Sequence, residues 1–347
     1  MIRSTTNGVL KSYRYRLQSS TNRLNDSRDT VLSGRNFNSF AEDPTTAARA
    51  FQIRSSLQRA EAQHRVGESV VSKYDVAWST LDSVINDVNN AKGDSALTAI
   101  LNGANGTTGS GRTALGQELT QLAGSIVRAM NAKYGDNFVF AGADGLNVPL
   151  VLEDDGTLRY RGIDVTNGTA SEMEALDYLV DNEKKFADLG LGLQEDENGE
   201  IIESSAFNVS LHAISYLGYG KDKDGDPKNI ACIINRMGEI LLNCDEEGRF
   251  HGNEETEFRR LVDKFNLSAA NLTDLHTQMD ARAAFLKSNQ TQLEHNIYTL
   301  QEQIVEIEDV DTAEAITSYS WAQYCYNAAL KVGNSILSQS LMDYLNS

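Results

Sequence analysis

The most constraining feature of this sequence is an apolar or small residue at every third or fourth position from Ala50 to Val88. This spacing aligns side chains along one face of a helix and is typical of a coiled-coil seam. Proline interrupts helices, and the 347-residue chain contains only three. One of them, Pro44, suits the first position of a helix, and Asp43 before it suits the N-cap. The predicted seam comprises Ala50, Ile53, Leu57, Ala60, His64, Gly67, Val71, Tyr74, Trp78, Leu81, Ile85 and Val88.

Similar seams are predicted toward both ends of the chain. The N-terminal seam comprises Leu10, Tyr13, Leu17, Leu24 and Val31, with Ser20 and Ser27 in the remaining positions. The C-terminal seam begins near Glu254 and comprises Phe258, Leu261, Phe265, Leu272, Leu275, Met279, Leu286, Leu293, Leu300 and Ile307. Polar residues interrupt it at Ser268, Arg282, Asn289, Asn296 and Gln303. Further helices are expected over residues 113–130 and after a break at "EDVDTAEA" (308–315).

The middle of the chain has a different character. Turn-forming clusters occur at "EDDGT" (153–157), "EDENGE" (195–200) and "KDKDGDP" (221–227), with short apolar runs between them. "FVFAG" (138–142) predicts a strand that leads into this region. The expected fold is mainly α: a coiled-coil helical bundle formed by the N- and C-terminal segments, with an inserted mixed α+β domain. Its predicted parts are a terminal helix and loop (1–45), the N-terminal part of the bundle (46–142), an inserted acidic variable domain (143–255), and the C-terminal part of the bundle with the other terminal helix (256–347).

Charge limits the partners of the chain and suggests how its ends pair. The formal net charge of −18 argues against general nucleic-acid binding, which requires a basic surface. Residues 1–35 contain 7 basic and 2 acidic residues, or +5, whereas residues 300–347 contain 1 basic and 7 acidic residues, or −6. Opposite charge beside two apolar seams predicts that the N- and C-terminal helices lie together.

Cysteine usage and hydropathy exclude several classes of protein. The three cysteines, Cys232, Cys244 and Cys325, have no Cys-x-x-Cys spacing, so neither a zinc site nor a disulfide framework is expected. No stretch of about 18 apolar residues predicts a membrane span. The N-terminus "MIRSTTNGVLKSYRYRL" lacks the apolar core of a signal peptide, so we expect a cytoplasmic protein or one exported without a cleaved signal.

Two motifs suggest ligands, but each has a simpler interpretation. "GTTGSGRT" (106–113) matches the phosphate-binding P-loop pattern except that Arg112 replaces the lysine, and no strand–helix–strand series surrounds it. A turn between helices is the favoured interpretation. Asp222, Asp224 and Asp226 resemble the start of a calcium loop, but the twelfth position is Ile233 rather than glutamate. We interpret this segment as a solvated turn and predict no catalytic residue, cofactor or metal.

Three segments together resemble the flagellin family. "SGRNFNSFAEDPTTAARAFQIRSSLQRAEAQ" (33–63) resembles the first block of that family, and its "AEDP" is more similar to the hook-associated branch than to filament flagellins. "ALGQELTQLAGSIVRAMNAKYGDNFVFAG" (114–142) also resembles this branch. The strongest similarity is "EDVDTAEAITSYSWAQYCYNAALKVGNSILSQSLMDYL" (308–345), whose ending "SLMDYL" differs from the usual flagellin terminus.

This resemblance implies a structural subunit of the bacterial flagellum that connects the hook to the filament. It implies export by the flagellar type III apparatus, and terminal segments that become helical on assembly. The implied partners are like subunits in a ring, the preceding hook-associated protein, flagellin and an export chaperone. A filament flagellin or minor flagellin is the alternative. The candidate subunit-interface residues are Leu10, Tyr13, Leu17, Leu24, Val31, Arg35, Asp43, Pro44, Leu330, Ile336, Leu337, Leu341, Tyr344 and Leu345.

Overall fold

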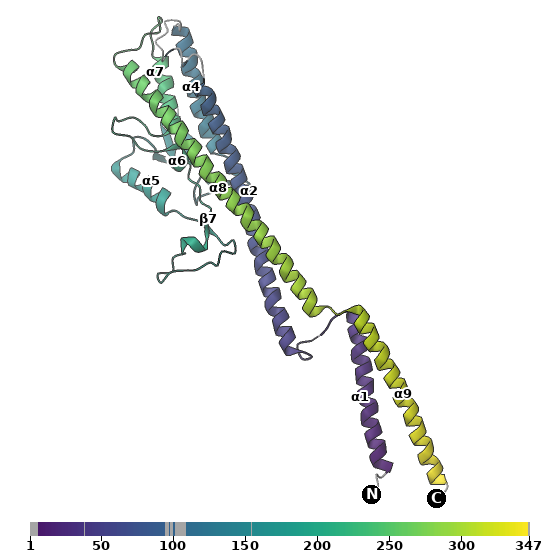
Figure 1. The fold of residues 1–347 in the computed structure, drawn as a ribbon. Coiled ribbons are helices and arrows are strands. Elements are labelled where there is room, and N and C mark those ends of the chain that lie inside the picture. Colours follow the sequence, from purple (N-terminus) through teal and green to yellow (C-terminus); the bar gives the residue numbers. More distant parts are fainter. Residues whose placement is uncertain are drawn as a thin grey trace. The chain divides into compact units, whose positions relative to one another are not determined.

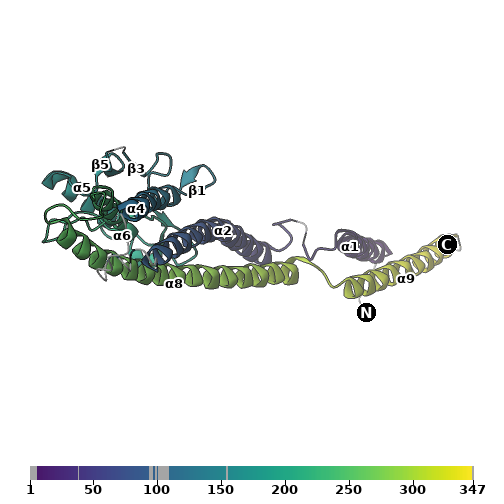
Figure 2. The same cartoon turned by 90° about the horizontal axis from the view of Figure 1, so that it is seen from above.

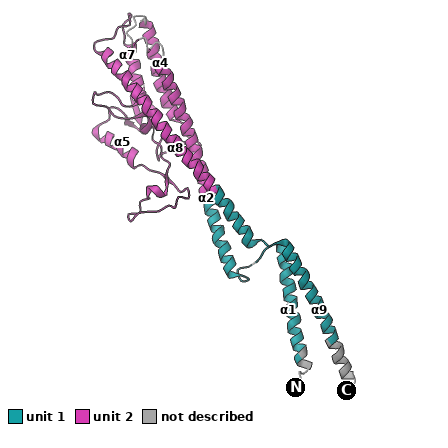
Figure 3. Cartoon of the chain, viewed as in Figure 1, with its two compact units in different colours: residues 1–61, 294–347 teal, residues 62–293 magenta. Residues whose placement is uncertain are grey.

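The chain forms two compact units, which share two long helices (Figures 1 and 3). The computed structural model describes residues 6–37, 39–93, 97, 100, 109–153 and 155–345. Unit 1 comprises residues 1–61 and 294–347, and unit 2 comprises residues 62–293. The helices that extend from one unit into the other are α2 (Pro44–Lys92) and α8 (Glu254–Glu308).

Unit 1 contains the two terminal helices, α1 (Thr6–Ser33) and α9 (Thr312–Leu345), with the first part of α2 and the last part of α8. The start of α2 is capped as the sequence predicts. Asp43 Oδ1 accepts the backbone N–H groups of Thr45 and Thr46, each at 3.1 Å, which satisfies donors that have no partner within the helix. The Thr46 hydroxyl donates to Asp43 Oδ2 at 2.6 Å, and these hydrogen bonds lower the pKa of Asp43.

The break predicted at "EDVDTAEA" separates α8 from α9 for a similar reason. Asp311 Oδ1 accepts the backbone N–H of Ala313 at 2.8 Å and that of Glu314 at 3.3 Å, so Asp311 caps the start of α9. Its carbonyl oxygen accepts the N–H of Ala315 at 2.8 Å, the first backbone hydrogen bond of the new helix. The two helices are therefore separate elements, as expected.

Unit 2 is a helical core with small antiparallel sheets on it. Its other helices are α4 (Gly109–Met130), α5 (Ala170–Asn182), α6 (Ala213–Leu217) and α7 (Ile230–Leu242), with a 3₁₀ turn at Glu203–Ser205. The strands are β1 (Lys133–Tyr134), β2 (Asn137–Phe138), β3 (Leu150–Leu152), β4 (Leu158–Tyr160), β5 (Ile163–Asp164), β6 (Phe186–Ala187) and β7 (Phe207–Asn208). They form the sheets β1-β2, β3-β4-β5 and β6-β7. The mainly α fold with an inserted α+β region is thus confirmed.

The core of unit 2 is one continuous cluster of buried side chains from α2, α4, α7, α8 and the strand region. The α2 seam differs from the predicted one over its second half, where Val70, Ala77 and Val84 are buried. Trp78, which the spacing placed in the seam, is 37% exposed and lies against the ring of His276 on α8, with ring centroids 5.0 Å apart. The prediction was wrong here because a helix in a multi-helix core buries a broader face than a two-stranded coiled coil does.

The expected strand "FVFAG" is also shorter than predicted. Only Asn137–Phe138 forms a strand, and Ala141 makes an isolated antiparallel bridge to His212. Val139, Phe140 and Ala141 are fully buried. Their apolar character therefore reflects burial in a turn rather than membership of an extended strand.

Candidate functional site: the paired terminal helices

The terminal helices α1 and α9 lie side by side in unit 1 (Figures 1 and 2). The candidate residues Leu10, Tyr13, Leu17, Leu24 and Val31 of α1 are all half-buried. On α9, the buried and half-buried positions recur at alternating steps of four and three: Ala315, Tyr319, Ala322, Tyr326, Ala329 and Gly333. The α9 residues of this seam are thus mostly small, which allows two helices to approach closely.

Gly333 of α9 is buried against Tyr13 of α1. A β-carbon built on Gly333 would lie 1.9 Å from the Tyr13 hydroxyl oxygen and 2.2 Å from its ring carbon Cζ. No side chain fits there while Tyr13 keeps its position. Glycine costs helix stability relative to alanine, so its presence mid-helix is explained by this contact.

The opposite face of α9 carries large apolar side chains in solvent. Trp321 is 67% exposed and Tyr324 is 65% exposed, and their rings stack with centroids 5.7 Å apart. Further exposed apolar residues on this helix are Ile316, Leu330 and Val332. Exposed apolar surface of this extent on one helix marks an interaction surface.

A groove of about 610 Å³ runs along the helix pair beside Trp321. From α1 it is lined by Arg16, Arg23 and three serines, and from α9 by Trp321 and Cys325. Among the described side chains, no ion pair connects α1 to α9. The opposite charges of the two helices therefore do not hold them together by direct contact, and the apolar seam does so instead.

A short connection joins the end of α1 to the junction of α8 and α9. The backbone N–H of Asn36 donates to Glu308 O at 2.8 Å, and that of Val310 donates to Gly34 O at 3.0 Å. The Asn36 side chain donates to the carbonyls of Ile307 and Asp309 at 3.1 and 2.9 Å. These bonds connect segments more than 270 residues apart in the sequence, and Arg54 of α2 also pairs with the buried Glu308.

The other candidate interface residues fall into two groups. Arg35, Asp43 and Pro44 are exposed, and Leu330 is exposed on the outer face of α9. The structure does not describe the side chains of Ile336, Leu337, Leu341, Tyr344 and Leu345, although α9 includes these residues.

Four further exposed apolar residues of α9 were not predicted as interface residues: Ile316, Trp321, Tyr324 and Val332. One signal could have found them. Helix α9 has apolar residues on all sides, which is typical of a helix that is buried all round. One partner helix cannot provide that burial, so a second contact surface was predictable.

The sequence of the N-terminal part matches a known family. Residues 5–144 match the sequence profile of the family described as the bacterial flagellin N-terminal helical region. This confirms the resemblance inferred from the sequence. A search of curated protein sequences found no match.

Solved flagellar structures share the fold. A putative flagellar hook-associated protein from Vibrio parahaemolyticus is 14% identical over 77% of this chain and 100% of its own, with a TM-score of 0.57. Flagellar hook associated protein-3 from Legionella pneumophila is 12% identical over 74% of this chain and 98% of its own, with a TM-score of 0.50. The described helices include none that is apolar over a membrane-spanning length.

The P-loop-like segment (106–113) lies within the matched residues 5–144. Its residues 106–108 lie outside the described residues, and α4 starts at Gly109. A β-carbon on Gly109 would meet the carbonyl oxygens of Glu246 at 2.4 Å and Asp245 at 2.7 Å. Carbonyl oxygens repel phosphate, so this helix start is not arranged to bind nucleotide. Arg112 stacks on the ring of Phe250 instead, 4.7 Å from its centroid.

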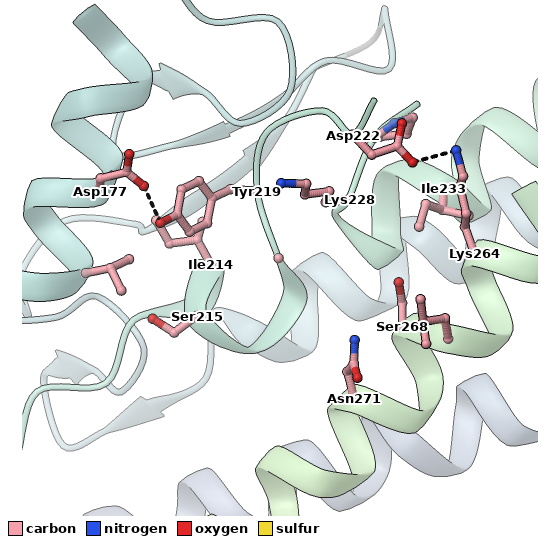
Figure 4. Close-up of a pocket in the computed structure, with 14 residues that line it drawn as sticks. Asp177, Ile214, Ser215, Tyr219, Asp222, Lys228, Ile233, Lys264, Ser268 and Asn271 are labelled. Atoms are coloured by element: carbon pink, nitrogen blue, oxygen red, sulfur yellow. Dashed lines mark hydrogen bonds and ion pairs between the residues drawn. The ribbon is translucent and has the colours of Figure 1, made fainter. Parts of the chain in front are cut away.

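The loop at residues 222–226, which resembles a calcium loop, forms ion pairs with two basic side chains of α8. Lys264 Nζ of α8 lies 2.5 Å from Asp222 Oδ2, 3.0 Å from Asp224 Oδ2 and 2.5 Å from Asp226 Oδ2. Arg260 Nε lies 2.5 Å from Asp226 Oδ2. Figure 4 shows Asp222 directed at Lys264 at the edge of a cavity of about 670 Å³. The interpretation as a solvated turn was therefore wrong, because this loop is bound to α8.

The protonation of this cluster follows from its contacts. Burial opposes the charge of Lys264, but its hydrogen bonds to the three carboxylates outweigh that effect and raise its pKa. The hydrogen bond from Arg260 lowers the pKa of Asp226 despite burial. Lys264, Arg260, Asp222 and Asp226 therefore stay charged at neutral pH.

Replacing Lys264 with methionine is expected to lower the free energy of unfolding by about 2–3 kcal/mol, because it leaves three carboxylates within 4.8 Å of one another without their shared cation. Denaturant unfolding at pH 7 measures the change. Lys287→Met is the matched control, since Lys287 pairs with Asp75 at 3.1 Å but both side chains are exposed, so its loss is expected to cost less than about 1 kcal/mol. Equal effects of the two substitutions would contradict the expectation.

Proposed function

We propose that this protein is a structural subunit of the bacterial flagellum that joins the hook to the filament. The observation that carries the proposal is the outer face of α9, where Trp321, Tyr324 and their apolar neighbours are exposed although the helix is already paired with α1. An isolated subunit gains nothing by exposing this surface, whereas an assembly in which helix pairs stack would bury it.

The junction role, rather than a filament role, is supported by the sequence at both ends of the chain. The "AEDP" segment at residues 41–44 and the C-terminal "SLMDYL" resemble the hook-associated branch, and the Legionella structure with a similar fold is a hook associated protein-3. In this proposal the partners are like subunits in a ring, the preceding hook-associated protein on one side and flagellin on the other. An export chaperone binds the protein before it passes through the flagellar export apparatus to the cell exterior.

The proposed role is mechanical and requires no catalysis or cofactor. The terminal pair α1–α9 forms the inner part of the assembly, and residues 143–255 project outward as the variable domain. The exposed residues Arg35, Asp43 and Pro44 lie at or near the connection between α1 and α2, where a neighbouring subunit contacts the chain.

Deletion of the gene tests this role. A deletion strain is expected to be non-motile, to keep its hooks and to release unpolymerised flagellin into the medium. Labelled protein restored to the strain is expected at the hook–filament boundary in electron micrographs. Normal filaments in the deletion strain would exclude the junction role, and a label along the whole filament would favour the alternative, a filament or minor flagellin.

Replacing Trp321 and Tyr324 together with serine is expected to reduce flagellum-bound protein at least about tenfold, because the outer face of α9 loses two large aromatic anchors. Protein retained on sheared flagella, compared with protein in the medium, measures the loss. Circular dichroism of the soluble subunit is expected to be unchanged, since both side chains are exposed there. Tyr178→Ser is the matched control, because Tyr178 is equally exposed at 65% but lies on α5 of unit 2. Wild-type attachment of the double variant would contradict the proposed use of this surface.

A further inference from the structure

Unit 2 contains a groove of about 900 Å³ that the proposed assembly role does not use. Its wall on one side is α2, with Val66, Val70 and Lys73, and on the other side are the β1-β2 hairpin and β6. Val66 and Leu146 are exposed at its rim. The groove is open to solvent and large enough to admit a small organic molecule.

The ε-amine of Lys73 is held inside this groove. The residue is half-buried, and its Nζ donates a hydrogen bond to the carbonyl oxygen of Val209 at 2.8 Å. Among the described residues, no carboxylate forms an ion pair with Lys73. This distinguishes Lys73 from Lys264, Lys184 and Lys287, each of which contacts at least one carboxylate.

The charged groups around Lys73 favour its neutral form. Burial lowers its pKa, and the ammonium of Lys185 in the same groove lowers it further, to about 8. His212, on a neighbouring segment, has a lowered pKa because it is desolvated, and it is therefore mostly uncharged at neutral pH.

The acidic groups that line the groove are Asp136, Asp144 and Asp188, and Tyr134 also lines it. Two of these carboxylates are already hydrogen-bonded elsewhere. Asp188 accepts from Gln63 Nε2 and from the backbone N–H of Gly190, each at 3.0 Å. Asp144 accepts from Asn147 Nδ2 at 2.8 Å. Although these carboxylates line the groove, none of the three forms an ion pair with Lys73.

We propose that Lys73 is a covalent modification site for small aldehydes, which enter the groove and form an imine on its ε-amine. The lone pair of the neutral amine attacks the carbonyl carbon, and the new C–N bond forms as the carbonyl π electrons move to oxygen. A proton moves from nitrogen to that oxygen, and loss of one water molecule leaves the C=N bond. The reaction consumes one amine and one aldehyde, releases one water and needs no oxidant or reductant.

The amine must be neutral for this reaction, so Lys73 differs from an ordinary lysine most at mildly alkaline pH. At pH 7.5 about one quarter of an amine with a pKa of about 8 is neutral, compared with about one in a thousand for an unperturbed lysine. At pH 10.5 an unperturbed lysine is about half neutral and Lys73 is almost fully neutral, so the difference falls to about twofold. The selectivity for Lys73 therefore depends on pH.

Labelling of the full chain with pyridoxal 5′-phosphate, an aldehyde whose imine borohydride reduces to a stable adduct, tests the proposal. Peptide mass spectrometry then gives the rate at each lysine. At pH 7.5, Lys73 is expected to react at least about tenfold faster than Lys287, and this ratio is expected to fall to about two at pH 10.5. Equal rates at Lys73 and Lys287 at pH 7.5 would overturn the proposal, and this comparison requires no variant.

Two matched substitutions test whether the ammonium of Lys185 makes Lys73 reactive. Lys185→Gln removes the second ammonium from the groove and is expected to slow labelling of Lys73 several-fold at pH 7.5. Lys184→Gln changes the adjacent lysine, which pairs with Glu203 and does not line the groove, and is expected to leave the rate at Lys73 unchanged. Equal effects of both variants would overturn the role assigned to Lys185.

Discussion

Replacing Gly116 or Gly238 with alanine is expected to destabilise the protein by about 2–4 kcal/mol, although alanine normally stabilises a helix by about 1 kcal/mol relative to glycine. The two glycines lie where α4 packs on α7. A β-carbon on Gly116 would lie 2.9 Å from the backbone oxygen of Gly238. A β-carbon on Gly238 would lie 2.6 Å from Thr120 Oγ1 and 2.8 Å from Gly116 O. Because backbone atoms cannot move aside alone, the whole helix pair must separate.

This separation would disturb the buried surface between α4 and α7. Helix α7 buries Ile233, Ile234, Met237, Ile240 and Leu241. Helix α4 buries Leu115, Leu119, Ile126 and Met130. Both sets belong to the same hydrophobic cluster. A shift of either helix therefore opens gaps among these buried side chains, which adds to the direct clash.

Urea unfolding of each variant gives the change in the free energy of unfolding. Gly124→Ala is the matched control, because Gly124 lies on the same helix and the nearest atom to its β-carbon would be the flexible end of Arg128, at 3.3 Å. This control is expected to be neutral or to stabilise the protein by up to about 1 kcal/mol. Stabilisation by Gly116→Ala equal to that of Gly124→Ala would show that the helices do not cross this closely.

The helices were predictable from the sequence because their signals are local and repeated. Asp43 and Pro44 give the start of α2, and Asp311 caps α9 at the predicted break. The helix predicted over residues 113–130 is α4, which starts four residues earlier. An apolar period maintained over many turns specifies a helix without knowledge of its partner.

The small sheets were not predictable in detail. Each strand has only two or three residues, which is too short for an alternating pattern to appear. Their positions depend on tertiary contacts such as the hydrogen bond from the Asn131 side chain to Leu150 O, at 2.8 Å. The ion pairs of the loop at residues 222–226 were also not predictable from local sequence, because their partner Lys264 lies about 40 residues away on α8.

The candidate site was predicted in part, for a physical reason. The α1 seam could be predicted from the sequence because its apolar residues recur with a single period. The outer face of α9 is not visible in this way, because Trp321 and Tyr324 share the helix with an inner seam of small residues. A helix with two apolar faces has apolar residues at most positions of its period, so its sequence shows no clear amphipathic pattern. Only the pairing of α9 with α1 shows which face remains exposed.

Replacing Gly333 with alanine is expected to abolish assembly, because the new β-carbon would overlap the hydroxyl and ring of Tyr13. Tyr13 is half-buried between α1 and α9, so a movement of its ring away from the methyl group would disturb the packing between the two helices. A cost of about 2–3 kcal/mol, typical of overpacking, would reduce the equilibrium constant for helix pairing about 30- to 160-fold. Attachment of the variant to flagella and motility of the complemented strain measure the loss.

A second substitution separates this clash from a general effect on α9. Tyr13→Ala in the Gly333→Ala background removes the overlapping ring, so two methyl groups would face each other where a tyrosine packs on a glycine. The double variant is expected to regain assembly relative to Gly333→Ala, although it loses the apolar contact of the tyrosine ring. Tyr13→Ala alone is expected to weaken assembly less than Gly333→Ala does. If the two substitutions instead add without any recovery, Tyr13 and Gly333 do not contact each other in the assembled state, and the pairing of α1 with α9 seen in the subunit is not the one that the flagellum uses.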